Sequence, residues 1–259
     1  MNSQLGGPSD SAPLSSAWSQ DCALHTYTAS LITDIVSSMQ SISPLRVSPQ
    51  PTPRIAKADR TRAAILNAAL DFVWSRPFRD MTVSSLMAST EVSRSAFYQY
   101  FNDLHEVMET LLEMLQAEIF EVAQPWMTAA GDPVALLRQT MDGLVRVCHK
   151  RGPFVRAVSD AATSDKRLEG AWWKFLGRFD DAASGRITAD QKQGLISDFD
   201  PRPVAFALNR LDAYTIIEAF GQRPRRRPEP VREALERIWI STLYGAQWVS
   251  KEYSDLMRR

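Results

Sequence analysis

The sequence predicts an all-α fold of about nine helices, with an N-terminal three-helix unit that contains a helix-turn-helix and a larger C-terminal helical domain. From residue 55 onward, apolar residues recur at intervals of three and four, which places them on one face of a helix. Glycine and proline separate these segments, and no stretch alternates apolar and polar residues as a half-buried strand does. With 44% hydrophobic residues, the 259-residue chain can form one large domain or two modest ones.

Charge and cysteine content narrow the class of protein. Formal net charge is zero and the sequence pI is about 6.8, whereas a protein that coats nucleic acid non-specifically is more basic. Residues 54–103 hold seven Lys/Arg against five Asp/Glu, so any DNA contact must come from a local patch. The two cysteines lie far apart, and neither a signal peptide nor an apolar run of membrane-spanning length occurs. We therefore expect a cytoplasmic protein.

Residues 1–53 form a Ser/Pro-rich N-terminal tail that we expect to be mostly disordered. Within this tail, residues 29–43 carry apolar side chains at helical spacing. Either they form an amphipathic helix that docks on the body, or the protein starts downstream of them. Four prolines between residues 44 and 53 then predict a stiff linker and a domain boundary.

The first helix of the body is predicted over residues 55–74 and ends before Pro77. Its apolar face includes Ile65 and Leu66, and basic residues lie at or before its start. Two interpretations of these basic residues remain open. They form either an arm that reaches DNA phosphates or the neighbouring minor groove, or an ordinary solvated helix start.

Residues 82–101 predict two short helices joined by a tight turn. Thr82 and Ser93 are suited to cap the two helices, because a hydroxyl side chain can accept a hydrogen bond from a free backbone N–H. In the second helix, the spacing turns Ala96, Phe97, Tyr100 and Phe101 inward and leaves Ser93, Arg94, Ser95, Tyr98 and Gln99 outward. The outward set can meet phosphates and base edges. The alternative is a plain helical hairpin within a larger bundle.

After a cap at Asn102 or Asp103, the remaining periodic segments predict helices over residues 104–127, 134–150, 165–192, 203–220 and 230–249. Gly152 and Pro153 are expected to separate the second of these helices from a short apolar segment over residues 154–162. The last two helices carry enough apolar residues to form a twofold dimer interface, although burial within one subunit is the alternative. Residues 221–228 between them hold four arginines that could contact DNA, but their distance in sequence from residues 93–100 favours a solvated loop.

The pattern V-S-R-x-x-F-Y-x-Y-F over residues 92–101 resembles the signature of the TetR/AcrR family of transcriptional regulators. This resemblance implies a DNA-binding domain over residues 54–103 and a ligand-binding and dimerisation domain over residues 104–259. The C-terminal half is most similar to the ethionamide-resistance regulators of actinobacteria, through residues 172–175, 207–211 and 238–245. It implies a repressor that binds a palindromic DNA operator as a homodimer through its last two helices and is released by a small hydrophobic ligand.

The resemblance also implies two sets of site residues. Those expected at DNA are Arg54, Lys57, Thr82, Ser84, Ser93, Arg94, Ser95, Tyr98, Gln99, Tyr100 and His105. Those expected around the ligand are Met114, Leu137, Leu144, Cys148, Trp172, Phe175, Phe179, Asn209 and Trp239, with Asn209 as a polar anchor among apolar walls. Each residue of the second set could equally be core.

The sequence departs from the family pattern at two positions. Glu91 stands in the turn where the family usually has glycine, so it must tolerate a strained backbone or shift the turn, and it adds negative charge near phosphate. Leu104 stands where a phosphate-gripping lysine commonly begins the next helix. Both changes should weaken non-specific DNA binding, which leaves His105 and the basic arm as substitutes.

An enzyme has no support in the sequence. The three histidines are widely separated, and we find no metal-ligand spacing, nucleophile motif or glycine-rich phosphate loop. We therefore expect no catalytic residues, cofactor or metal. The remaining alternative to a repressor is a helical protein-interaction or ligand-sensing module with weakened DNA binding, for which Glu91 and Leu104 are the best arguments.

Overall fold

The computed structural model describes residues 53–245, and it describes side chains from residue 57 onward. Within this part of the chain there are eight α-helices, one short 3₁₀ helix and no strand, which confirms the all-α prediction. The predicted helix over residues 29–43 and the predicted end of the last helix beyond residue 245 lie outside the described residues. The elements are α2 (Pro53–Val73), η1 (Phe78–Asp80), α3 (Val83–Met87), α4 (Arg94–Tyr100), α5 (Leu104–Thr128), α6 (Pro133–Ala162), α7 (Lys166–Lys192), α8 (Pro201–Phe220) and α9 (Pro228–Tyr244).

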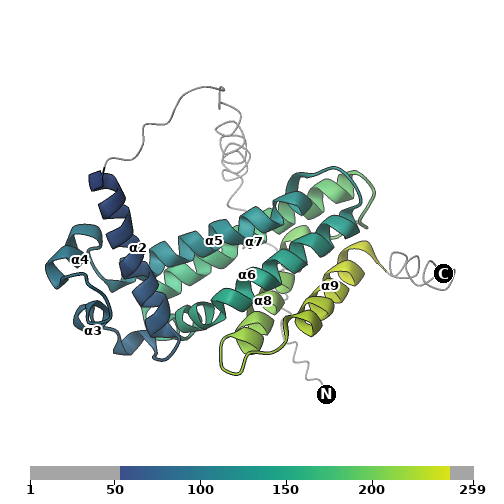
Figure 1. The fold of residues 1–259 in the computed structure, drawn as a ribbon. Helices are drawn as coiled ribbons and strands as arrows, with labels where there is room; N and C mark the ends of the chain where they lie inside the picture. Colours follow the sequence, from purple (N-terminus) through teal and green to yellow (C-terminus); the bar gives the residue numbers. More distant parts are fainter. Residues whose placement is uncertain (1–52, 246–259) are drawn as a thin grey trace, which may run out of the picture. The chain divides into compact units, whose positions relative to one another are not determined.

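Helices α2, α3 and α4 gather at one end of a bundle formed by α5 to α9 (Figure 1). Helix α6 is the central member of this bundle and packs against α5, α7, α8 and α9. Buried apolar side chains form one continuous cluster that includes Phe97 of α4, Met108 of α5 and Leu235 of α9. The small end unit is therefore joined to the bundle through a shared core.

Short polar side chains begin most of the helices. Thr82 and Ser93 cap α3 and α4 as predicted, and Asp103 caps α5 by accepting a hydrogen bond from the Glu106 N–H at 2.8 Å. Further caps at α6, α7 and α8 come from Asp132, Asp165 and Asp200. Each aspartate satisfies free N–H groups and places negative charge at the positive end of a helix.

Helix α6 runs unbroken through Gly152 and Pro153, so the predicted break before residues 154–162 is wrong. Proline lacks the N–H that would bond the His149 carbonyl one turn earlier. The Arg225 guanidinium donates a hydrogen bond to this carbonyl instead. Gly152 lies so close to the end of α8 that a Cβ atom there would sit 2.3 Å from the Phe220 carbonyl oxygen. The two residues thus permit a close helix crossing without ending the helix.

No helix among residues 53–245 is long and apolar enough to span a membrane.

Replacing Gly152 with alanine should lower the free energy of unfolding by at least about 2 kcal/mol, because the new methyl group overlaps the α8 backbone. Gly185→Ala on α7 is the matched control, since a Cβ there meets nothing within 4 Å. The control should gain about 0.5–1 kcal/mol from helix propensity alone. Urea unfolding of both variants is the measurement, and equal stability of the two would contradict the close crossing.

Candidate functional site

Helix α4 presents one exposed polar face. The side chains of Ser93, Arg94, Ser95, Tyr98 and Gln99 are all exposed, as the spacing predicted, and Tyr98 is 50% exposed. The hydroxyl of Ser93 accepts a hydrogen bond from the Ala96 N–H at 3.1 Å, and it lies 3.0 Å from the Ser95 hydroxyl. A helix start with exposed hydroxyl, guanidinium, phenol and amide groups is suited to contact a nucleic-acid backbone and base edges.

The buried face of α4 fixes how this helix stands on the protein. Phe97 and Phe101 are fully buried, with ring centroids 5.9 Å apart, as the inward prediction required. Ala96 and Tyr100 are half-buried, and Tyr100 packs against the core. Helical spacing thus describes Tyr100 correctly, while the DNA contact that the resemblance implies for it stays a prediction.

Side-chain hydrogen bonds hold both the start of α3 and the turn between α3 and α4. Thr82 and Ser85 form a reciprocal cap, in which each hydroxyl accepts a hydrogen bond from the other residue's backbone N–H at 3.0 Å. Farther along, the Thr90 hydroxyl donates to the Met87 carbonyl and accepts from the Val92 N–H, both at 3.1 Å. Sequence reasoning missed Thr90, although a threonine placed between two caps is a recognisable turn residue.

Basic side chains near α4 differ in their surroundings. Lys57 and Ser84 are exposed, and Arg94 forms no ion pair with any residue that the structure describes. Arg62 is also exposed, and its guanidinium lies 5.2 Å from the centroid of the Phe101 ring. The side chain of Arg54 lies outside the described side chains. Arg94 and Lys57 are thus exposed, and the DNA contacts expected of them stay predictions.

His105 and Leu104 face the protein. The His105 Nε2 atom lies 2.6 Å from the Asp165 Oδ2 atom, and its ring meets the edge of Phe78 at 5.3 Å. The structure thus joins His105 to the cap of α7, and the phosphate contact expected of it stays a prediction. Burial would raise the pKa of Asp165, but the hydrogen bonds from His105 and from the Leu168 N–H lower it overall. Leu104 is half-buried against the core.

Two arginine contacts tie the end unit to the bundle. Arg167 at the start of α7 donates two hydrogen bonds to Glu109, at 2.7 and 2.8 Å, and one to Asp103 at 2.7 Å. In the loop before α9, the guanidinium groups of Arg223 and Arg225 lie 4.6 and 5.0 Å from the ring centroid of Trp74. The predicted solvated loop is therefore an incomplete description, because this arginine pair packs on an aromatic residue at the end of α2.

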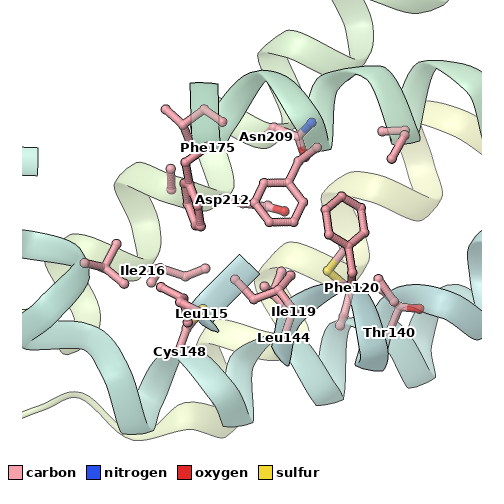
Figure 2. Close-up of a pocket in the computed structure, with 18 of the residues that line it drawn as sticks. Leu115, Ile119, Phe120, Thr140, Leu144, Cys148, Phe175, Asn209, Asp212 and Ile216 are labelled. Atoms are coloured by element: carbon pink, nitrogen blue, oxygen red, sulfur yellow. The ribbon is translucent and has the colours of Figure 1, made fainter. Parts of the chain in front are cut away.

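A cavity of about 100 Å³ lies inside the bundle, between α5, α6, α7, α8 and α9 (Figure 2). Helix α6 contributes Thr140, Leu144 and Cys148, spaced by one turn each. Helix α8 faces them with Asn209, Asp212 and Ile216. Such spacing keeps each set on one side of its helix, so two helix faces form opposing walls.

Most of the residues predicted around a ligand do line this cavity, namely Leu144, Cys148, Trp172, Phe175, Phe179, Asn209 and Trp239. Met114 and Leu137 do not. Met114 is 44% exposed and borders a smaller hollow between α2 and α5, while Leu137 is fully buried in the core. Met114 lies on another face of α5 than its neighbour Leu115, which lines the cavity, whereas Leu137 lies one turn before Thr140 on the same side of α6, beyond the end of the cavity lining.

Aromatic rings form much of the cavity wall. Trp172 stacks on Phe175 with centroids 5.5 Å apart, and Phe175 meets the edge of Phe179 at 5.1 Å. Phe120 stacks on Phe179 at 4.9 Å, and Trp126 meets Trp239 at 5.7 Å. Sequence reasoning missed Phe120 and Trp126 because it assigned the cavity face of α5 to Met114. The wall suits an apolar ligand.

Polar groups in the cavity are few. The Trp239 Nε1–H donates to both carboxyl oxygens of Asp212, at 3.0 and 3.1 Å, and burial raises the pKa of Asp212 to about 7 despite this hydrogen bond. Burial also raises the pKa of the Cys148 thiol to about 12, so the thiol is neutral at physiological pH. The amide of Asn209 donates to Asp180 at 2.9 Å. Asp212 was missed, although a lone carboxylate within an apolar helical stripe is a visible signal.

Metal binding has no evident place in the described part of the chain. No group of three or more His, Cys, Asp or Glu side chains among its residues is arranged to hold a metal ion.

Asp212→Asn should stabilise the protein more at pH 8 than at pH 5. The pKa of Asp212 is near 7 in the folded protein and has its usual value of 3.8 in the unfolded chain. Between these two pH values the folded protein binds more protons than the unfolded chain. The wild type therefore loses stability as pH rises from 3.8 to 7. Asparagine does not titrate. The variant's gain over wild type should be on the order of 2 kcal/mol larger at pH 8.

Urea unfolding at both pH values measures this difference. Asp181→Asn is the control, because that exposed carboxylate pairs with Arg202 outside the cavity. A stability difference for Asp212→Asn that is equal at the two pH values would show that the carboxyl is not held in its protonated form by burial.

Comparison with known proteins identifies relatives of both halves. Residues 137–245 match the family model described as "Transcriptional regulator EthR, C-terminal domain". The chain is 27% identical over 192 residues to the HTH-type transcriptional regulator EthR of Mycolicibacterium smegmatis, an alignment that covers 72% of this chain and 88% of that protein.

Solved structures resemble the fold of the described chain. A TetR-family transcriptional regulator from Syntrophomonas wolfei has a TM-score of 0.63 at 18% identity, covering 71% of this chain and 94% of the other. AibR, solved in complex with isovaleryl coenzyme A and operator DNA, has a TM-score of 0.55 at 16% identity, covering 71% of this chain and 98% of the other. At these identities the likeness concerns the fold alone.

Proposed function

Because the chain belongs to the TetR/AcrR family of transcriptional regulators and is EthR-like in its C-terminal half, we propose that it is a ligand-responsive repressor that binds a palindromic operator as a homodimer. In this proposal, residues 54–103 are the DNA-binding domain and residues 104–259 the ligand-binding and dimerisation domain. A small hydrophobic ligand enters the cavity and releases the DNA.

The observation that carries the proposal is the exposed face of α4, held by a capped turn and two buried phenylalanines. A rigid helix is what a major-groove reader needs, because its side chains must meet base edges in a fixed register. The apolar cavity between α5 and α9 supports the second half of the proposal. AibR, a neighbour in fold, was solved in complex with isovaleryl coenzyme A and operator DNA, so a protein of this fold can hold a small molecule and DNA together.

Helices α8 and α9 are proposed as the homodimer interface. Tyr214 on α8 is 70% exposed, and the outer face of α9 presents the small side chains of Ala234 and Ser241. An exposed aromatic ring on one helix and small exposed residues on the other suit close packing against a second copy of the chain. Such a dimer would place two reading helices on the two halves of a palindrome.

Arg94→Ala should weaken binding to an operator in the protein's own upstream DNA by roughly 10- to 100-fold, since it removes an exposed cation from the groove helix. Arg146→Ala is the control, because that arginine is exposed on α6 and pairs with Asp142. Fluorescence anisotropy with a labelled duplex at fixed moderate salt measures both. Failure of the wild-type protein to bind any palindromic site would favour the alternative of a ligand-sensing module with weakened DNA binding.

Trp172→Ala and Asn209→Leu should alter ligand-induced release of DNA while leaving operator affinity within about twofold of wild type, because both residues line the cavity and neither belongs to the DNA-facing set. The measurement is the ligand concentration that releases half of a pre-bound labelled duplex. An unchanged release curve in both variants would place the effector site elsewhere in the protein.

A further inference from the structure

Asp212 is a carboxyl group in a cavity whose other walls are largely apolar or aromatic. It is 6% exposed and borders the cavity together with the rings described above (Figure 2). Among the described residues, its hydrogen-bond partner is the Trp239 indole N–H, which donates to both oxygens. No lysine or arginine among the described residues forms an ion pair with it. Two carboxyl oxygens share a single neutral donor, so the group retains unused capacity to accept hydrogen bonds.

The groups that face Asp212 leave it as the charged centre of the cavity. From α6 it faces the Cys148 thiol, which is neutral because burial raises its pKa to about 12. From α7 it faces the aromatic rings of the cavity wall. Asp180, which is also on α7, pairs with Arg210 at 2.9 Å. Glu118 of α5, the other acid that acts on Cys148, pairs with Arg151 at 2.6 Å. Asp180 and Glu118 are therefore each paired with an arginine, whereas Asp212 has no ion-pair partner among the described residues.

An ionised carboxylate is costly in such surroundings unless a positive group accompanies it. Burial accordingly raises the pKa of Asp212 to about 7, so that both forms are populated at neutral pH. A cation that entered the cavity would favour the ionised form and would gain a full ion pair in a medium of low dielectric constant. A neutral or anionic ligand would gain no such interaction.

The walls around Asp212 also suit a cation. Trp172, Phe175, Phe179 and Trp239 all border the cavity, and aromatic faces attract ammonium groups, most strongly when water is excluded. A second polar group supports the presence of a ligand with a polar head. Thr140 is 5% exposed and lines the same cavity, and its hydroxyl has no hydrogen-bond partner within the described part of the chain.

We propose that the effector is an amphiphilic amine whose protonated nitrogen binds the Asp212 carboxylate while its hydrocarbon part lies along the aromatic wall. This inference rests on the proposed function, because it takes the cavity to be the effector site. It narrows the ligand from a small hydrophobic molecule to a hydrophobic cation, and it disfavours fatty acids, whose carboxylate would face Asp212 with like charge.

The test compares three probes that differ only in the head group, namely n-octylamine, n-octanol and octanoate. Isothermal titration calorimetry with the full-length chain at pH 8 should show octylamine binding at least tenfold more tightly than either of the others. At this pH the amine is still protonated and Asp212 is mostly ionised. Octylamine affinity should fall as pH drops below 7, because Asp212 then takes up a proton. Equal or tighter binding of octanol or octanoate would overturn the proposal.

Two Asp→Asn variants distinguish the loss of the Asp212 charge from an effect on folding. Asp212→Asn keeps an acceptor for the Trp239 N–H and should bind octylamine and octanol equally, within about twofold. Asp181→Asn removes the same charge from the surface of α7, outside the cavity, and should keep the full preference. Circular dichroism confirms that each variant is folded. A preference for octylamine that survives in folded Asp212→Asn would contradict the proposal.

DNA release then separates this inference from the proposed function. If octylamine binds with the predicted preference but never displaces DNA from the wild-type protein, the amine site stands and the release mechanism fails. If octanol displaces DNA as effectively as octylamine in the same assay, the cavity is an effector site but the amine inference is wrong.

Discussion

Helix α6 crosses the end of α8 at Gly152 with backbone so close that no larger residue fits. This crossing lets α6 continue across the whole bundle and present Thr140, Leu144 and Cys148 to the cavity. The adjacent Pro153 frees the His149 carbonyl, which Arg225 then uses to fix the loop between α8 and α9. The cavity wall and the loop that packs on Trp74 therefore depend on the same short segment of α6.

The end unit that carries α4 shares its apolar core with the bundle, and polar and cation–aromatic contacts lie around this junction. His105 meets Asp165, Arg167 bridges to Asp103 and Glu109, and the arginine pair of the α8–α9 loop packs on the last turn region of α2. The His105 and Arg167 contacts join the start of α5 to the start of α7, and both of these helices also line the cavity. In the proposed mechanism, a ligand that changes the spacing of α5, α7 or α8 would act on the attachment of α4 and so on DNA binding.

Local signals in the sequence were sufficient for the fold class, the caps at Thr82 and Ser93, and the exposed face of α4, because each depends on a few neighbouring residues. The break expected at Gly152 and Pro153 was wrong because the compensating contacts come from Phe220 and Arg225, far along the chain. Met114 and Leu137 were expected around the ligand from the family resemblance, which does not fix where the cavity of this particular chain begins and ends. Asp212 was missed because its importance depends on burial among α6, α7 and α9.

Reciprocal linkage between the two proposed sites tests the central claim most directly. The affinity of the full-length protein for n-octylamine can be measured with and without saturating operator duplex, and the affinity for the duplex with and without saturating octylamine. Both affinities should fall by the same factor of at least tenfold, because a coupling free energy between two sites acts equally in both directions. Tight binding of both partners with no mutual effect would show that the cavity does not control the DNA-reading helix.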